Sequence, residues 1–130
     1  MKQIFTDSGV SLVLAEGIQS WDMHPLILAW LITAVIRIAV GSATVAGLTT
    51  AGILAPLVPT LDVDPNLLVL SIGAGSLVFS HFNDGGFWMC KEYFNLSIKD
   101  TLKSWTLMET IVAVAGLGGV LLLDLLLKVL

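Results

Sequence analysis

Polar side chains within the apolar stretches of this chain are the residues best placed to do chemistry. Arg37 lies inside the apolar segment 25–40, and Asp84 stands before two glycines. On membrane-insertion scales, a charged side chain at the bilayer centre costs about 2.5–3.5 kcal/mol, so such residues are rare and often functional. Arg37 therefore predicts a cation that meets an anionic ligand, or one that pairs with a carboxylate on another helix or reaches the lipid headgroups.

Asp84 is the leading candidate for a group that carries protons, because intramembrane carboxylates often mark proton or ion pathways. His81 is the second candidate, since imidazole titrates near neutral pH. The alternatives are that Asp84 caps a helix in an aqueous loop and that His81 lies at the membrane interface. We favour the intramembrane interpretation for Asp84, because the adjacent glycines predict a helix break there.

A third group combines small and hydroxyl residues. Gly41, Ser42 and Thr44 lie between two short apolar runs. Glycine lets the backbone turn, and the hydroxyls and freed amides at a helix N-terminus can bind an anion. Close packing of a continuous helix explains the same small residues equally well.

Composition indicates the class of protein. The chain has 130 residues, of which 56% are hydrophobic and 12% are charged, whereas soluble domains carry about 25% charged residues. We therefore expect an integral membrane protein that contacts the lipid bilayer. The absence of a basic patch argues against nucleic acid as a partner. Cys90 is the single cysteine, and no metal, cofactor, nucleotide or enzyme motif is visible, so we predict neither a metal site nor an enzyme.

The apolar runs predict an all-α membrane protein. We expect an interfacial segment at 1–24. Segment 25–59 is either one long helix or a hairpin that enters the membrane, turns at Gly41–Thr44 and leaves on the same side; the hairpin is favoured because both apolar arms are short. Segment 66–94 is expected to be a discontinuous helix opened at Asn83–Gly86. A polar link at 95–104 would lead to the last transmembrane helix at 105–130.

Several blocks of sequence together resemble a known family. GSATVA at 41–46 is followed by HFNDGGFW at 81–88, KEYF at 91–94 and KSWTLMET at 103–110. In this order the blocks are similar to the C-terminal region of the gluconate:proton symporter (gluconate permease) family. The resemblance covers nearly the whole chain and is firmest over 28–123.

The resemblance implies a multi-pass protein of the bacterial inner membrane that takes up gluconate or a related sugar acid together with protons. It implies the C-terminal half of an inverted-repeat ion-transporter fold, with a re-entrant hairpin, a broken helix and a final transmembrane helix. Asp84 and His81 would then couple protons to transport. The residues expected to bind the substrate are Arg37, Gly41, Ser42, Thr44, Asn83, Gly85 and Gly86.

The chain is much shorter than members of this family, which we expect to run to several hundred residues. The predicted function is therefore that of the C-terminal part of a proton symporter, whose partner would be the missing N-terminal part or an oligomeric partner. Two alternatives remain: a truncated membrane fragment that transports nothing, and a small membrane subunit that needs a separate N-terminal partner.

Overall fold

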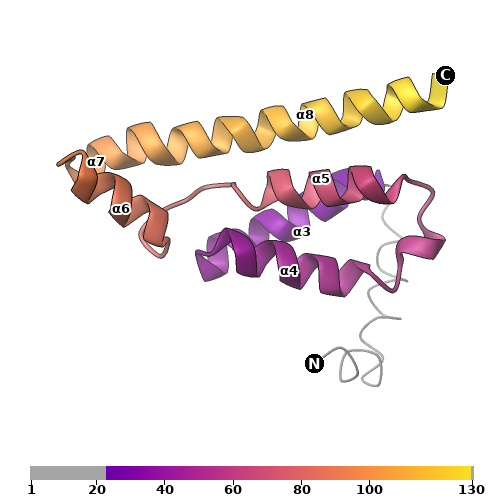
Figure 1. Cartoon of the computed structure of the whole chain (residues 1–130), viewed down its shortest axis with the longest axis horizontal. Helices are drawn as coiled ribbons and strands as arrows, with labels where there is room; N and C mark the ends of the chain where they lie inside the picture. Colours follow the sequence, from indigo (N-terminus) through magenta and orange to yellow (C-terminus); the bar gives the residue numbers. More distant parts are fainter. Residues whose placement is uncertain (1–22, 130) are drawn as a thin grey trace.

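Every regular element in the part of the chain that the structure describes, residues 23–129 of a computed structural model, is a helix (Figure 1). This agrees with the predicted all-α class. The interfacial segment predicted at 1–24 lies outside the described residues except for its last two. The elements are α3 (Pro25–Val40), α4 (Ala43–Leu54), η1 (Val58–Thr60), α5 (Pro65–Gly75), α6 (Gly85–Tyr93), α7 (Ile98–Thr101), η2 (Leu102–Thr106) and α8 (Leu107–Val129).

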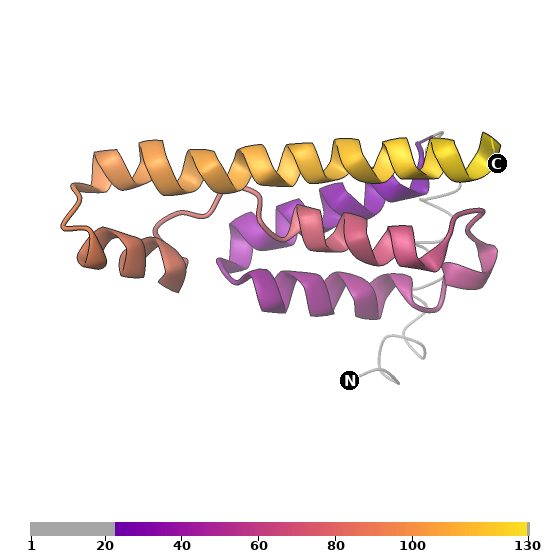
Figure 2. The same cartoon turned by 45° about the horizontal axis from the view of Figure 1, so that its top comes forward.

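Helices α3 and α4 run back along each other and are joined by two residues (Figure 2). Gly41 ends α3 in the left-handed conformation, with φ of 79°, and its N–H donates a hydrogen bond to the carbonyl oxygen of Arg37 at 2.8 Å. Glycine adopts this conformation without steric cost. Ser42 then caps α4, since its hydroxyl accepts from the N–H of Val45. Residues 25–59 therefore do not form one continuous helix, and the connection is shorter than Gly41–Thr44 because Thr44 already lies in α4.

The interruption between α5 and α6 is wider than the sequence indicated. Helix α5 ends at Gly75, and residues 76–84 form turns before α6 begins at Gly85. The prediction of an opening at Asn83–Gly86 is wrong in its position, since Gly85 and Gly86 form the first turn of α6. The physical reason is helix capping: a carboxylate oxygen of Asp84 accepts from the N–H of Gly86 at 3.1 Å.

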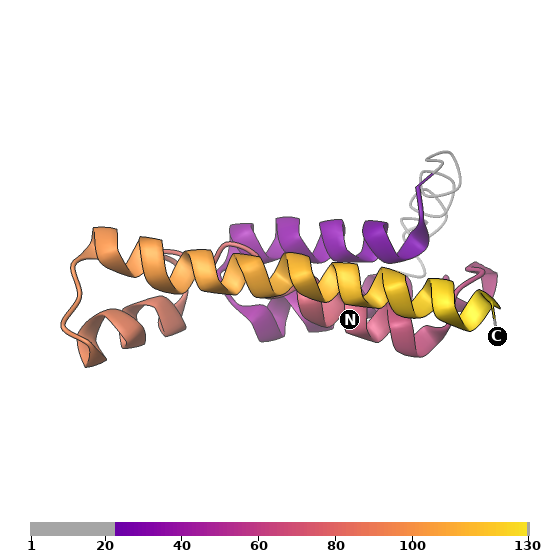
Figure 3. The same ribbon diagram turned by 90° about the horizontal axis from the view of Figure 1, so that it is seen from above.

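The last helix begins earlier than expected. Ser97 caps α7 by accepting from the N–H of Asp100 at 3.2 Å, and the helical path continues through the π-helical segment η2 into α8. The polar link predicted at 95–104 is thus helical from Ile98 onward. The combined helix Ile98–Val129 is the one element within 23–129 long and apolar enough to cross a membrane. Helix α8 runs along the whole bundle (Figure 3).

Helices α3, α5 and α8 form the core. Leu26 and Ala29 of α3 pack with Leu68 and Ile72 of α5 and Val120 of α8, all buried. Most other apolar side chains of α8 point outward and are exposed. The α6–α7 connection and η1 lie at opposite ends of the molecule (Figure 1). The end of α3 and the start of α6 meet between these two ends.

Candidate functional site

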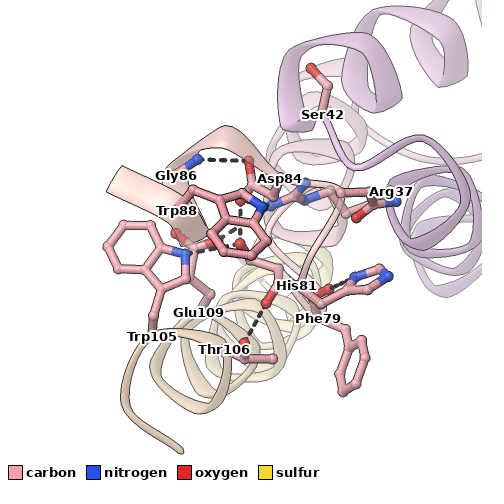
Figure 4. A network of polar contacts seen from close by, with 12 residues as sticks. Arg37, Ser42, Phe79, His81, Asp84, Gly86, Trp88, Trp105, Thr106 and Glu109 are labelled. Carbon is pink, nitrogen blue, oxygen red and sulfur yellow. Dashed lines mark hydrogen bonds and ion pairs between the residues drawn. The ribbon is translucent and has the colours of Figure 1, made fainter. Parts of the chain in front are cut away.

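A buried ion pair joins α3 to the start of α6. Arg37 lies in the last turn of α3 with 2% of its side chain exposed, and its Nη2 donates to Oδ2 of Asp84 at 2.7 Å. The sequence singled out both residues but did not predict that they pair. The structure supports the alternative that Arg37 pairs with a carboxylate elsewhere in the fold, and Figure 4 shows the two side chains directed toward each other.

Both carboxylate oxygens of Asp84 accept hydrogen bonds. Oδ2 accepts from Arg37 and from the hydroxyl of Ser80, and Oδ1 accepts from the N–H of Gly86. Asp84 is therefore at once the N-cap of α6 and the ion-pair partner of Arg37. The capping role proposed as an alternative for Asp84 is observed, and it coexists with burial of the pair.

A second carboxylate reaches the same guanidinium from α8. Oε2 of Glu109 lies 3.7 Å from Nη2 of Arg37, and 15% of the Glu109 side chain is exposed. The sequence analysis did not select Glu109 as a site residue. The signal that identifies it is the same as for Arg37: an ionisable residue within an apolar helix.

Arg37 keeps donors that no described residue uses. Within residues 23–129, its Nε and Nη1 have no hydrogen-bond acceptor although both atoms are buried. Buried polar groups are normally paired, so an unpaired buried guanidinium nitrogen calls for an explanation. Arginine binds carboxylates through several N–H donors at once. Arg37 therefore has hydrogen-bonding capacity beyond its pair with Asp84.

Side chains of the last helix hold the segment between α5 and α6. Nε1 of Trp105 donates to the hydroxyl of Ser80 at 2.9 Å, and the hydroxyl of Thr106 donates to the carbonyl oxygen of Ser80. One turn further on, the hydroxyl of Thr110 accepts from the N–H of Phe79 at 3.2 Å. The two threonine contacts satisfy backbone groups between α5 and α6, and the sequence did not indicate any of the three contacts.

Asn83 and Gly41, both predicted site residues, lie against each other. The side-chain amide of Asn83 donates to the carbonyl oxygen of Ile38 at 3.0 Å. A Cβ added to Gly41 would overlap the backbone of Asn83. In this structure Asn83 therefore binds the end of α3, and Gly41 is small because the two segments approach so closely.

The other predicted residues lie around this centre rather than in it. The hydroxyl of Ser42 points away from Asp84 (Figure 4), and Thr44 is exposed on α4. Gly85 is exposed in the first turn of α6. The ring of His81 packs beside Phe79, with Nδ1 at 2.9 Å from the Phe79 carbonyl oxygen, and makes no contact with the ion pair. Among the described residues, no group of three or more acidic, histidine or cysteine side chains could hold a metal ion.

Comparison with known proteins places this chain in a family. The model of the GntP family permeases matches residues 1–126. The chain is 53% identical over 124 residues to a high-affinity gluconate transporter of Escherichia coli strain K12 and to a gluconate permease of Bacillus subtilis strain 168. It is 46% identical over 123 residues to the Gnt-II system L-idonate transporter of Escherichia coli strain K12.

Each of these matches covers 95% of this chain but only 28% of the relative. No solved structure matches the chain significantly. The relatives are named as transporters or permeases, which agrees with the expectation that the chain is not an enzyme. The resemblance identified from the sequence blocks is confirmed: the chain is a membrane protein and belongs to the GntP family of permeases.

Proposed function

We propose that this chain supplies a substrate- and proton-binding centre of a secondary active transporter, which carries gluconate or a related sugar acid with protons across the bacterial inner membrane. The observation that carries the proposal is the buried guanidinium of Arg37, which has unpaired donors and lies beside two carboxylates at a helix interruption. Similarity to named gluconate and L-idonate transporters supports the same substrate class.

The fold proposed for this function is the C-terminal repeat of an inverted-repeat transporter. In it, α3 and α4 form the re-entrant hairpin, α5 and α6 form the broken helix, and α8 is the final span. The lengths support this assignment, because α3, α4 and α5 have 16, 12 and 11 residues, below the roughly 20 that a crossing helix needs. Short helices interrupted at membrane depth are typical of transporter binding sites.

A sugar acid offers one carboxylate and several hydroxyls. The carboxylate would accept from the unpaired nitrogens of Arg37. The N-termini of α4 and α6 start close together beside this centre (Figures 1 and 2), and helix N-termini favour anions. The proposed contacts to the substrate hydroxyls come from residues at these two starts, namely Gly41, Ser42, Thr44, Asn83, Gly85 and Gly86.

The balance of charge around Arg37 supports the proposal that substrate binding is coupled to proton binding. The single positive charge of Arg37 already faces two carboxylates, so a bound sugar-acid anion adds a third negative charge to a poorly solvated centre. Like charges held close together in such a place favour protonation of one of them. The sequence proposes Asp84, with His81 second, as the group that takes this proton.

The test is uptake of radiolabelled gluconate by proteoliposomes under an imposed proton gradient. Two proteins are compared. The first is the chain alone. The second, called the joined protein, is the Bacillus subtilis permease in which this chain replaces the region that it matches. We expect the joined protein to accumulate gluconate above the external concentration. Arg37→Gln should lower gluconate affinity roughly ten- to a hundredfold, because a hydrogen bond to a charged group contributes about 1.5–3 kcal/mol.

Lys91→Gln is the matched control, since it removes a cation from α6 outside the site and should leave affinity unchanged. If Arg37→Gln, compared at equal amounts of folded protein, binds gluconate as the wild type does, Arg37 is not part of the binding site. A joined protein that inserts but accumulates no gluconate would contradict the transport proposal.

The second possibility is a small membrane subunit that acts only with a separate partner, or a chain that inserts and transports nothing. One observation favours the subunit: α8 leaves many apolar side chains exposed, which a partner chain would cover. Uptake by the chain produced together with the preceding part of the permease as a separate protein, but not by the chain alone, would support the subunit. Uptake by neither would support the non-transporting chain.

A further inference from the structure

We propose that Glu109, rather than Asp84, takes up the proton that accompanies the sugar acid, while Asp84 keeps Arg37 in position. This inference rests on the proposed function and assigns separate roles to the two carboxylates of the same centre. It is carried by the difference between their hydrogen-bond partners.

The two carboxylates differ in partners and not in exposure. The exposed fraction of the side chain is 16% for Asp84 and 15% for Glu109. Asp84 accepts hydrogen bonds from Arg37, Ser80 and the Gly86 N–H. A proton on Oδ2 would compete with Arg37 and Ser80 for that oxygen, and a proton on either oxygen would remove the negative charge that pairs with Arg37.

Glu109 accepts no hydrogen bond from any described residue. Its nearest cationic partner is Nη2 of Arg37 at 3.7 Å, beyond hydrogen-bond length, and that nitrogen already donates to Asp84. A proton can therefore bind to Glu109 without breaking a hydrogen bond. Protonation of Glu109 weakens only its electrostatic attraction to Arg37.

The charged groups that face Glu109 are few. They are Arg37 from α3 and Asp84 from the segment before α6. His81 belongs to the same segment, but its ring packs beside Phe79 and Phe82. Thr106 at the end of η2 and Thr110 of α8 fix where Glu109 lies, because both bind the segment between α5 and α6.

The unpaired donors of Arg37 connect ligand and proton. When a sugar-acid carboxylate accepts from Nε or Nη1, it shares the charge that had balanced Glu109. The oxygen of Glu109 then binds a proton delivered as hydronium from the side of higher proton concentration. Glu109 becomes neutral, and the net charge of the centre returns to its value before the anion bound. When the anion leaves, the positive charge of Arg37 again favours the ionised carboxylate, and the proton is released.

The first test does not depend on transport. Infrared difference spectra of the chain in lipid vesicles, recorded between acidic and neutral pH, report carboxyl groups that gain a proton in a weakly hydrated place. We expect such a carboxyl band in the wild type, in Asp84→Asn and in the control Asp124→Asn, and its loss in Glu109→Gln. Glu109→Asp keeps a carboxyl group and should retain a shifted band, which shows that loss of the band is not a folding defect.

Retention of the full band in Glu109→Gln, or its loss in Asp84→Asn alone, would overturn the assignment. This result stands even if the wild type carries no gluconate, so failure of the transport proposal remains distinguishable from failure of this one.

The second test uses the joined protein. Glu109→Gln should lose accumulation driven by the proton gradient and keep exchange of labelled for unlabelled gluconate, and its gluconate affinity should no longer depend on pH. Asp84→Asn should lose both accumulation and exchange, because Arg37 loses its anchor. Gluconate accumulation by Glu109→Gln that matches the wild type would contradict the proposal.

Discussion

The side-chain amide of Asn83 binds the carbonyl oxygen of Ile38 at 3.0 Å, and this contact brings the start of α6 against the end of α3. Gly41 lies in the same contact, where a Cβ would overlap the backbone of Asn83. The ion pair between Arg37 and Asp84 spans the same junction. The close approach of two interrupted segments is therefore what assembles the site.

Gly41→Ala should destabilise the protein. A left-handed conformation costs a residue other than glycine about 1–2 kcal/mol, and overpacking adds roughly 1–3 kcal/mol. Unfolding of the chain in detergent, followed by circular dichroism, measures the loss. Gly52→Ala is the matched control, because Gly52 lies in α4 with nothing within 4 Å of an added Cβ. It should leave stability equal or slightly higher, since alanine favours helix. Equal stability of the two variants would show that the junction is not tightly packed.

Arg37→Gln should destabilise the fold by about 3–5 kcal/mol, because removing one partner of a buried ion pair leaves the other charge uncompensated. Asp84→Asn in the same molecule should recover part of the loss, and a double-mutant cycle measures the coupling. Lys91→Gln, which removes the more exposed contact with Glu92, should change stability by less than about 1 kcal/mol. Additive effects of Arg37→Gln and Asp84→Asn would argue that the two side chains do not interact.

Gly75→Ala should separate α5 from α3. A Cβ at Gly75 would lie 2.5 Å from the carbonyl oxygen of Trp30, whereas one at Gly73 would meet nothing within 4 Å. We expect a loss of roughly 1–3 kcal/mol for Gly75→Ala and little change or a small gain for Gly73→Ala. Both glycines belong to α5, so the pair isolates packing from helix propensity. Thermal unfolding in detergent measures the difference. Equal melting temperatures of the two variants would contradict this prediction.

Asp124→Ala should weaken the opposite end of the bundle. Oδ2 of Asp124 lies 3.2 Å from Nε2 of His24 and accepts from Lys128 at 2.8 Å, and the residue is buried. Loss of both contacts should cost about 1–2 kcal/mol, reduced by the exposure of the partners. Lys128→Gln removes one contact and should cost less. Limited proteolysis near the start of α3 measures the opening, and equal cleavage of wild type and Asp124→Ala would refute the role.

The sequence predicted most residues of the centre but not which of them form ion pairs and hydrogen bonds. Charge, small size and a helix break can each be recognised from the local sequence. These signals identified Arg37, Gly41, Asn83 and Asp84. Their pairing was not predictable, because 47 positions separate Arg37 from Asp84. A single sequence does not show which distant residues lie close together in space.

Ser80 was missed for a related reason, whereas Glu109 shows the same signal as Arg37, an ionisable residue within an apolar helix. Ser80 is held by Trp105 and Thr106, which lie 25 and 26 positions later, and neither hydroxyl residue is unusual by itself. The position of the helix break was misjudged because two glycines outweighed the capping preference of the aspartate before them. Asp124, an ionisable residue in the last helix, contacts His24 and Lys128, and the sequence did not indicate either partner.

Glu109 and Asp124 lie on the same uninterrupted helix, α8, where Glu109 faces Arg37 in the last turn of α3 and Asp124 contacts His24 just before α3 begins. Roughly 22 Å of helix separates them at about 1.5 Å per residue. Because an α-helix transmits rotation about its own axis with little internal twist, turning α8 to re-aim one carboxylate re-aims the other. Any rotation of α8 about its axis would therefore move both carboxylates together.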